Sequence, residues 1–360
     1  MEKILVTGGA GFIGANFIHF ALSTDPDIEI FNLDALTYAG NLSNLDILPD
    51  PARHYFIEGR IEDTSLVMDI LQKHEIFKVV HFAAETHVDR SLLDPERFVA
   101  TNVWGTVSLL NAAYQVWREQ GMLDDPCVQF HHISTDEVFG ELQQGEPSFS
   151  EATPYSPNSP YSASKAASDH FVRAYHHSFG LPITITNCTN NYGQFQYPEK
   201  LIPLMVLNAV NQKPLPVYGT GSQVRDWLYV TDHCEAIWSV LNKGRAGETY
   251  CIGGNNQPTN LEVVQAICSI LDELRPIAGS SYTDLIRFVT DRPGHDFRYA
   301  MNINKITQEL GWSPRTDLKT GLKKTVQWYL DNPKWVQDVI EKNEYKNWIT
   351  DNYTKQRTAK

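Results

Sequence analysis

A tyrosine and a lysine lie four residues apart, at Tyr161 and Lys165, in the segment YSASK. At this spacing two side chains share one face of a helix. A nearby ammonium favours the phenolate, so we expect Lys165 to lower the pKa of Tyr161. A phenol tuned in this way can take a proton from an alcohol while a hydride leaves the carbon. The pair therefore predicts alcohol oxidation, although tyrosine and lysine also occur at this spacing by chance.

Two consecutive carboxylates, Asp136 and Glu137, follow Thr135 at the end of an apolar run. Close carboxylates repel each other, which raises one pKa and can keep a proton available near neutral pH. Such a site can hold a base and an acid together. Because neighbours on a regular strand point to opposite faces, the pair can meet in one site only on a bend at the strand end. The alternative is a solvated acidic turn.

A glycine-rich turn lies between the first predicted strand and the first predicted helix, in the run TGGAGFIG of residues 7–14. Glycine lets the backbone approach a pyrophosphate, and the helix N-terminus offers free N–H groups and a positive dipole end. Asp34 follows Gly14 by about 20 residues, where a carboxylate accepts hydrogen bonds from the adenosine ribose. Asp34 would repel a 2′-phosphate, and Ala35 supplies no cation to hold one. The turn therefore predicts an NAD site rather than an NADP site.

These groups must be positioned by elements that alternate along the chain. Short β-branched runs predict strands at residues 3–7, 29–33, 54–57, 78–82, 128–133 and 183–187. Amphipathic stretches predict helices at residues 12–22, 65–74, 102–118 and 162–179. This alternation predicts an α/β fold with a doubly wound parallel sheet of the Rossmann type. Active sites of such sheets lie at the strand ends.

The alternation weakens after about residue 191, and a different organisation follows. A loop is expected at residues 192–201, then a helix at 202–211 and a short strand at 216–218. We expect an NAD-binding domain over residues 1–191, rejoined by about residues 225–250, and a smaller C-terminal α/β lobe over residues 192–330 that mainly binds substrate. The tail, residues 331–360, fits either a surface helix or an oligomer contact.

Composition narrows the class of protein. The chain has 360 residues and a formal net charge of −13, which argues against nonspecific nucleic-acid binding. No apolar run reaches about 18 residues, so no membrane span is expected. The five cysteines include no CxxC pair, which favours a reducing cytoplasm over a disulfide framework. Adjacent histidines at 131–132 and 176–177 diverge on a strand or helix, so no metal site is expected.

The glycine turn together with Tyr161 and Lys165 resembles the extended short-chain dehydrogenases/reductases, and the triplet at 135–137 resembles the nucleotide-sugar 4,6-dehydratases among them. Residues 35–42 and 82–91 are also similar, and the resemblance runs from Ile4 to about Trp328. It implies oxidation at C4 of a hexose with NAD, loss of the C6 hydroxyl as water, and hydride return to C6. It gives Tyr161, Glu137 and Asp136 the roles of alcohol base, C5 base and C6 acid.

The same resemblance implies the binding residues. Lys165 would also bind the nicotinamide ribose, and Thr135 the reacting hydroxyl. NAD would contact Gly8, Gly11, Phe12, Ile13, Gly14, Asp34, Ala35, Leu36, Thr37, Arg60, Ile61, Phe82, Ala83, Ala84, Thr101, Tyr161, Lys165 and Asn191. A nucleotide sugar, dTDP-glucose by similarity, would contact Thr86, Thr135, Asn190, Lys200, Leu201, Pro216, Tyr218, Arg225, Asn260, Arg292, His295 and Tyr299. Arg225 and Arg292 suit a diphosphate, because guanidinium forks bind phosphate oxygens bidentately.

Departures and alternatives remain. Arg60 stands where many relatives carry aspartate against the adenine, Ala35 replaces a frequent lysine or asparagine, and Asn187 a frequent arginine. A nucleotide-sugar 4-epimerase would need Tyr161 and Lys165 but not the two acids. A UDP-glucuronate decarboxylase and an NAD-binding protein with an inactive site are further alternatives. The predicted helices at 102–118 and 162–179 would form a homodimer contact, as in relatives, or serve as ordinary packing helices.

Overall fold

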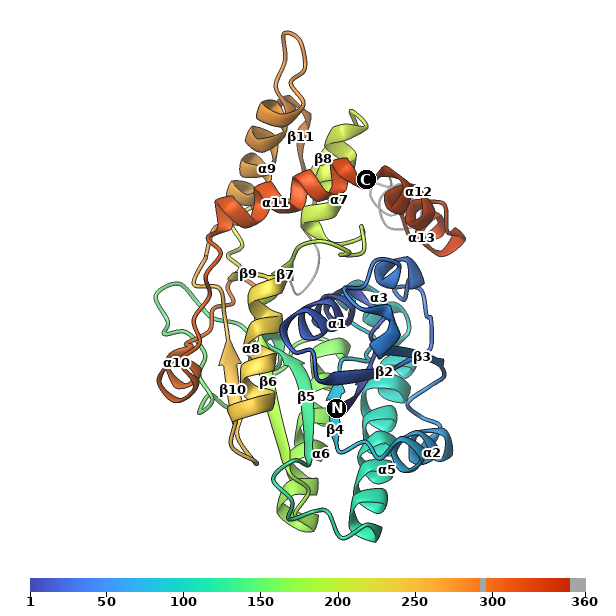
Figure 1. Ribbon diagram of the computed structural model, residues 1–360. Helices are drawn as coiled ribbons and strands as arrows, with labels where there is room; N and C mark the ends of the chain where they lie inside the picture. The colour runs from blue at the N-terminus through green and yellow to red at the C-terminus, as the bar shows by residue number, and fades with distance from the viewer. Residues whose placement is uncertain (292–295, 350–360) are drawn as a thin grey trace.

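The fold is centred on a seven-stranded sheet. It is seen in a computed structural model that describes residues 1–291 and 296–349 (Figure 1). All neighbouring strands pair in parallel, in the order β10-β6-β5-β4-β1-β2-β3. The strands are β1 (Glu2–Thr7), β2 (Ile28–Asp34), β3 (His54–Glu58), β4 (Lys78–His81), β5 (Gln129–Thr135), β6 (Ile183–Cys188) and β10 (Thr249–Ile252). The predicted doubly wound parallel sheet is confirmed.

Helices cover both faces of this sheet, which explains why its strands are apolar on both sides. In β1, Leu5 packs in one buried cluster, while Ile4 and Val6 pack in another. The cluster around Leu5 includes residues of α2 (Thr64–His74), α5 (Thr106–Glu119) and α6 (Pro160–Phe179). The cluster around Ile4 includes residues of α1 (Phe12–Thr24) and α8 (Val230–Lys243).

The predicted helix at 102–118 begins differently from the expectation. The chain passes from α3 (Val88–Leu93) through α4 (Pro95–Phe98) into a π-helical segment, η3 (Val99–Gly105), before α5 starts. Asn102 is buried there, and its amide donates to the carbonyl of Glu85 (3.0 Å) and to the hydroxyl of Ser164 (2.8 Å). Wide turns of this kind occur often at functional sites, and this one carries Thr101.

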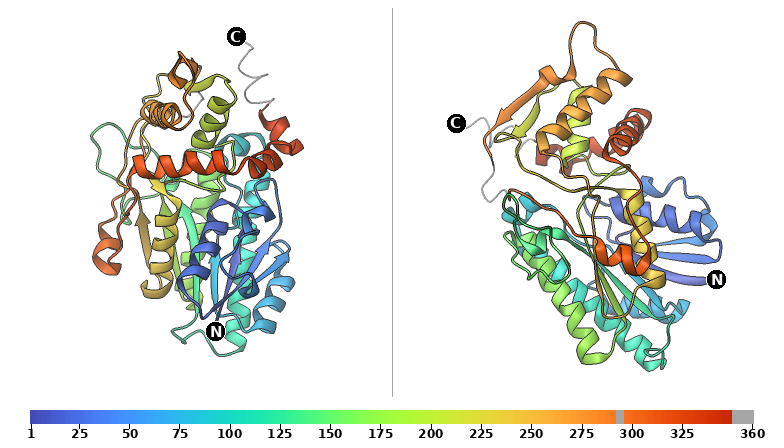
Figure 2. Two further views of the ribbon diagram at one scale, coloured as in Figure 1. Left: turned by 45° about the horizontal axis from the view of Figure 1, so that its top comes forward. Right: turned by 90° about the vertical axis from the view of Figure 1, so that its left-hand side faces the viewer.

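A smaller group of elements lies beyond one end of the sheet, the end toward which β10 points (Figures 1 and 2). Two short parallel pairs belong to it, β8 (Leu215–Tyr218) with β11 (Ile286–Val289) and β7 (Asn190–Tyr192) with β9 (Trp227–Tyr229). Three helices, α7 (Leu201–Val210), α9 (Asn260–Leu274) and α11 (Leu318–Asp331), share a buried apolar cluster. Further along the chain, helix α8 packs against the large sheet, and strand β10 is its edge strand. The exact domain limits stay a prediction.

The segment after Asp331 is helical up to Ile349, with α12 (Pro333–Ile340) and α13 (Asn343–Ile349). Trp335 and Val339 are buried in the same cluster as α7, α9 and α11. The tail therefore packs on its own chain over these residues. Within the two described ranges, no helix combines the length and the apolar character that a bilayer crossing needs.

The remaining elements are short. They are α10 (Asn304–Leu310), which packs against β10, and four 3₁₀ turns, η1 (Leu42–Leu45), η2 (Pro51–Arg53), η4 (Asp136–Phe139) and η5 (Tyr282–Leu285). Among them η4 matters most for function, because it bends the chain directly after β5. The bend that the acid pair requires is therefore present.

Candidate active site

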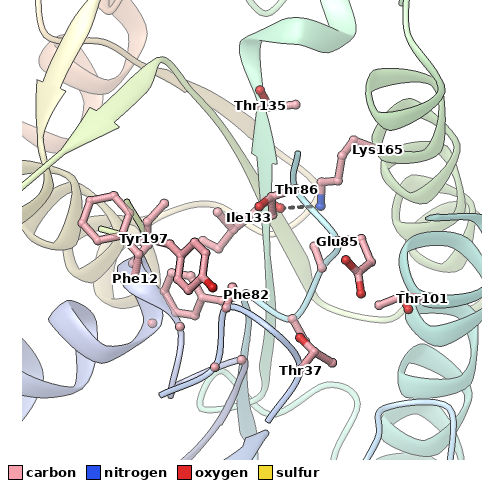
Figure 3. A pocket seen from close by; sticks show the side chains of 18 of the residues that line it. Phe12, Thr37, Phe82, Glu85, Thr86, Thr101, Ile133, Thr135, Lys165 and Tyr197 are labelled. Carbon is pink, nitrogen blue, oxygen red and sulfur yellow. Dashed lines mark hydrogen bonds between the residues drawn. The ribbon is translucent and has the colours of Figure 1, made fainter. Parts of the chain in front are cut away.

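A cavity of about 290 Å³ lies where the strand order reverses, at the carboxyl ends of β1, β2, β4 and β5 (Figure 3). Ligands of open α/β sheets bind at such a switch point. Among the predicted residues, its lining contains Gly8, Gly11, Phe12, Ile13, Gly14, Asp34, Ala35, Thr37, Arg60, Ile61, Phe82, Ala83, Ala84, Thr86, Thr101, Thr135, Asp136, Glu137, Tyr161, Lys165, Asn190, Asn191 and Lys200. Residues from nine separate stretches of sequence, between positions 8 and 200, thus meet in one cavity.

The glycine turn needs glycine for steric reasons visible in the structure. Gly8 has φ +74°, and a Cβ there would lie 2.7 Å from the backbone nitrogen of Ala83. A Cβ on Gly14 would lie 2.3 Å from the carbonyl oxygen of Gly8. Gly11 caps helix α1 without a side-chain hydrogen bond, so the first N–H groups of the helix remain available to a ligand. This arrangement suits a pyrophosphate.

Asp34 holds the turn as well as facing the cavity. Its Oδ2 accepts from the backbone N–H of Ala10 (2.9 Å), and its Oδ1 accepts from that of Leu36 (2.8 Å). Burial raises the pKa of Asp34, and the two N–H donors oppose that rise. Each carboxylate oxygen keeps capacity for a ribose hydroxyl. Leu36, predicted as a cofactor contact, is not in the lining; its N–H is used by Asp34, and its φ is +47°.

Tyr161 and Lys165 both line the cavity from helix α6, but the expected electrostatics are wrong for this structure. Burial and the charge of Glu137 raise the pKa of Tyr161, while a hydrogen bond with Thr135 opposes the rise. The ammonium of Lys165 donates to the carbonyl of Ile133 (2.7 Å), the contact drawn in Figure 3. Burial lowers the pKa of Lys165 to about 8. Lys165 is thus oriented by strand β5 rather than by the phenol.

The two acids meet the condition set by the sequence. Asp136 and Glu137 begin the 3₁₀ turn η4, and both line the cavity. The hydroxyl of Thr135 accepts from the N–H of Glu137 and caps this turn (3.2 Å). Asp136 is 2% exposed, and burial followed by the charge of Glu137 raises its pKa well above the ordinary range. A buried aspartic acid beside a second carboxylate is suited to hold a proton.

A buried polar network lies behind Lys165. Asp169, one turn further along α6, accepts from the hydroxyls of Ser134 and Tyr155, each at 2.8 Å. Its other oxygen lies 3.2 Å from Nε2 of His132, which in turn lies 3.3 Å from Nζ of Lys165. Burial opposes ionisation of Asp169, yet His132, Lys165 and Arg173 keep its pKa low. The network fixes helix α6 against the strand that carries the acids.

Sequence reasoning missed several lining residues. They include Tyr38, Glu85, Cys188, Gln196, Tyr197 and Glu199. Glu199 is buried and pairs with Arg90 (3.0 Å), which lies 3.8 Å above the ring of Tyr38. Glu85 pairs with Arg97 at 2.7 Å. These pairs join residues that are distant in sequence, so spacing gave no signal; only the position of Glu199 beside Lys200 and of Glu85 beside Thr86 pointed to them.

The predicted substrate residues divide into two groups. Thr86, Thr135, Asn190 and Lys200 line the cavity, and the ammonium of Lys200 donates to the carbonyl of Thr86 (3.2 Å). The lining does not include Leu201, Pro216, Tyr218, Arg225, Asn260 or Tyr299. These six lie on or beside α7, β8, β9 and α9, or on the segment after β11, in the smaller group of elements. Arg292 and His295 lie outside the described residues.

Arg225 and Tyr299 nevertheless lie near the acids. The guanidinium of Arg225 is 4.4 Å from the ring centre of Tyr299. Its charge opposes the rise in the pKa of Asp136, and burial, followed by the charge of Glu137, raises the pKa of Tyr299. Arg225 also donates to the backbone carbonyls of Val224 and Asp296, each at 2.8 Å. The guanidinium that was expected to bind a diphosphate is therefore partly used in holding the loop.

The parallel sheet, the glycine turn and the Tyr161–Lys165 pair define a short-chain dehydrogenase/reductase of the extended type. Within this class, the acid pair Asp136 and Glu137 indicates a dehydratase. The chain belongs to the family whose sequence model is described as GDP-mannose 4,6 dehydratase, which matches residues 5–325.

Named relatives agree with this family. The chain is 55% identical to a dTDP-glucose 4,6-dehydratase of Xanthomonas campestris pv. campestris (strain B100), over 95% of this chain and 97% of the relative. It is 48% identical to dTDP-glucose 4,6-dehydratase 1 of Escherichia coli (strain K12), over 98% and 99% of the two chains. The crystal structure of a dTDP-glucose 4,6-dehydratase from Streptomyces venezuelae with NAD and TYD bound has a TM-score of 0.84, 44% identity, and coverage of 94% and 99%.

Proposed function

We propose that this protein is an NAD-dependent lyase that converts dTDP-glucose into dTDP-4-keto-6-deoxy-glucose. The observation that carries the proposal is the position of Asp136, buried with a raised pKa, beside Glu137 in the cavity that also holds Tyr161. A 4-epimerase has no use for two acids at this place. The relatives of known name and the family match support the same reaction.

The cavity fits the cofactor. Backbone groups of the glycine turn and the α1 N-terminus would hold the pyrophosphate, and Asp34 the adenosine ribose. Buried oxygens of Asn190, Asn191 and Asp136 have no hydrogen-bond partner within the described part of the chain, although all three residues line the cavity. Buried polar atoms are rarely left unpaired, so these oxygens indicate a ligand. When bound, NAD would supply the acceptor for the hydride that leaves C4, and its reduced form would supply the hydride that is later added to C6.

The side chains then move the protons. Tyr161 takes the proton of the C4 hydroxyl, with Thr135 binding the same oxygen. Burial and the charge of Glu137 oppose the ionisation of Tyr161. A nearby positive charge must therefore stabilise the phenolate, and the candidates are the ammonium of Lys165 and the nicotinamide ring. The C4 ketone acidifies the C5 hydrogen, Glu137 removes it as a proton, and C5 is protonated again when the hydride returns to C6. Asp136, held protonated by burial, gives its proton to the departing C6 hydroxyl.

A direct assay tests this function. The purified protein is incubated with NAD and dTDP-glucose, and alkali is then added. A 4-keto-6-deoxy sugar develops strong near-ultraviolet absorbance, whereas an epimerised hexose does not. We expect the absorbance to appear with wild-type protein and to be absent with Tyr161→Phe, which cannot accept the C4 proton. Formation of dTDP-galactose without this absorbance would support an epimerase instead.

We also propose that the protein is a cytoplasmic homodimer. Large apolar side chains are exposed on α3, η3 and α6, namely Leu92, Leu93, Val99, Trp104 and Phe171. Exposed apolar patches of this kind often mark interfaces. The five cysteines are all free, which suits a reducing compartment. Sedimentation of wild-type protein and of Trp104→Glu tests the dimer, which should weaken in the variant; a wild-type monomer would exclude it.

A further inference from the structure

The C-terminal helices reach the cofactor end of the cavity. Figure 1 shows α12 and α13 on the side of the molecule that carries α1 and α3. Their residues 333–349, here called the C-terminal strap, touch the segment that follows β2. The indole N–H of Trp335 donates to Oδ1 of Asn44 (2.7 Å), a contact between residues 291 positions apart. Lys342 donates to the carbonyl of Gly40 (3.3 Å).

Asn44 passes this contact on to the glycine turn. Its Nδ2 donates to the carbonyl of Ala10 (2.9 Å), and the N–H of Ala10 donates to Asp34 (2.9 Å). Trp335 and Asn44 are 7% and 1% exposed, so water does not compete for these hydrogen bonds. Ala10 lies between Gly9 and Gly11. A continuous series of hydrogen bonds therefore joins the strap to the two groups that face pyrophosphate and ribose.

The chemistry of the indole gives the series a direction. An indole N–H is only a donor, so it requires the oxygen of the Asn44 amide to face Trp335. The amide nitrogen must then face the carbonyl of Ala10. Without the indole N–H, the oxygen of the Asn44 amide loses its donor, and the amide is held less firmly against that carbonyl, which also accepts from the N–H of Asn41 (3.0 Å). Trp335 thus orients Asn44, and Asn44 orients the turn.

A second contact supports the same side of the cavity. The ring of Tyr345, on α13, packs edge-on against Tyr197 (6.0 Å between centroids). Tyr197 packs in the same way against Tyr38 (5.6 Å). Tyr38 and Tyr197 line the cavity together with Phe12, the first residue of α1, and Figure 3 labels Tyr197 and Phe12 among the lining side chains. The strap therefore supports the cofactor side through both hydrogen bonds and aromatic packing.

We propose that the C-terminal strap is a retention device for the cofactor, with Trp335 as the positioning residue that acts through Asn44 on the glycine turn. The inference rests on the proposed function only in taking NAD as the cofactor. The strap touches the turn and not the reacting carbons, so it slows release of NAD between turnovers and leaves the chemical step to other residues.

The test uses Trp335→Phe, which keeps an aromatic ring in the cluster but removes the N–H. Its matched control is Trp312→Phe, because Trp312 is also buried, and its indole N–H has no hydrogen-bond partner within residues 1–291 and 296–349. Bound NAD is chased with labelled NAD in full-length protein, and thermal melting is measured after NAD has been removed. We expect Trp335→Phe to release NAD about two- to tenfold faster, the equivalent of one hydrogen bond, while Trp312→Phe releases it at the wild-type rate.

Further variants complete the test. Asn44→Ala should release NAD at least as fast, and adding Trp335→Phe to it should change nothing more, because the two act in series. Equal release rates in wild type and Trp335→Phe would overturn the inference, as would equal acceleration in both tryptophan variants. If Trp335→Phe does not fold, Lys342→Met is expected to accelerate release in the same direction, and an unchanged rate there overturns the proposal. A wild-type protein that binds no NAD would overturn the proposed cofactor as well.

Discussion

The two ends of the cavity present different kinds of chemical group to their ligands. Where the pyrophosphate binds, at the cofactor end, glycines 8, 11 and 14 and the α1 N-terminus offer backbone dipoles, which do not titrate. At the sugar end, Asp136, Glu137, Tyr161 and Lys165 are side chains whose protonation is set by burial and by one another. Binding a constant anionic group needs only fixed dipoles, whereas chemistry that moves protons needs groups with shifted pKa values.

The strongest test of this division is Glu137→Gln. It removes the C5 base but keeps the shape, so we expect dehydration to fall by about 10²- to 10⁴-fold while NAD binding is unchanged. Product formation and bound NAD are measured on the same protein. Glu96→Gln, an exposed change on α4, is the control and should behave as wild type. Dehydration retained by Glu137→Gln would refute the C5 assignment.

Two glycine variants test the cofactor end. Gly14→Ala places a Cβ 2.3 Å from the carbonyl of Gly8, so it should destabilise the NAD-free protein by about 1–3 kcal/mol. Gly11→Ala meets the same carbonyl at 3.3 Å. Gly11→Ala should leave the NAD-free protein nearly as stable as wild type. It should weaken the binding of NAD, because the new methyl group lies in the lining of the cavity. Chemical unfolding and NAD titration of both variants check this. Equal unfolding free energies would contradict the steric explanation of Gly14.

The pH dependence tests the sugar end. Burial lowers the pKa of Lys165 to about 8, so its ammonium loses the proton as pH rises through that value. The positive charge that assists Tyr161 is then lost. We expect the first hydride transfer to slow by up to about tenfold per pH unit above pH 8. Single-turnover appearance of NADH, followed from pH 6 to pH 9.5, measures the effect. A rate that does not fall above pH 8 would contradict this role of the Lys165 ammonium.

The smallest expected effect belongs to Asp34→Asn. An amide presents one acceptor and one donor, so it can accept from only one of the two N–H groups that Asp34 now binds. It also loses the charge that excludes a 2′-phosphate. We expect NAD to bind about five- to tenfold more weakly and NADP relatively better. Titration with each cofactor measures both constants. An unchanged preference for NAD would place the selectivity elsewhere.

The N-terminal half could be predicted well because its signals are local. Apolar runs gave the strands β1, β2, β4, β5 and β6, and the glycine turn fell where β1 meets α1. The start of the helix predicted at residues 102–118 could not be read from the sequence. Its π-helical segment depends on Asn102 reaching Glu85 and Ser164, which no sequence period reveals. The pairs of Glu199 with Arg90 and of Glu85 with Arg97 escaped for the same reason.

The sequence by itself determined six of the seven strands of the sheet, all but β10, together with the glycine turn, the acid that follows it and the catalytic residue types, because each depends on neighbours within a few positions. Tertiary structure alone decided the protonation of the catalytic side chains and the contacts that hold them and the glycine turn in place. It turned Lys165 toward Ile133 rather than Tyr161, buried Asp136, and brought Trp335 to Asn44. Burial and long-range contacts set these features, and both exist only once distant segments pack together.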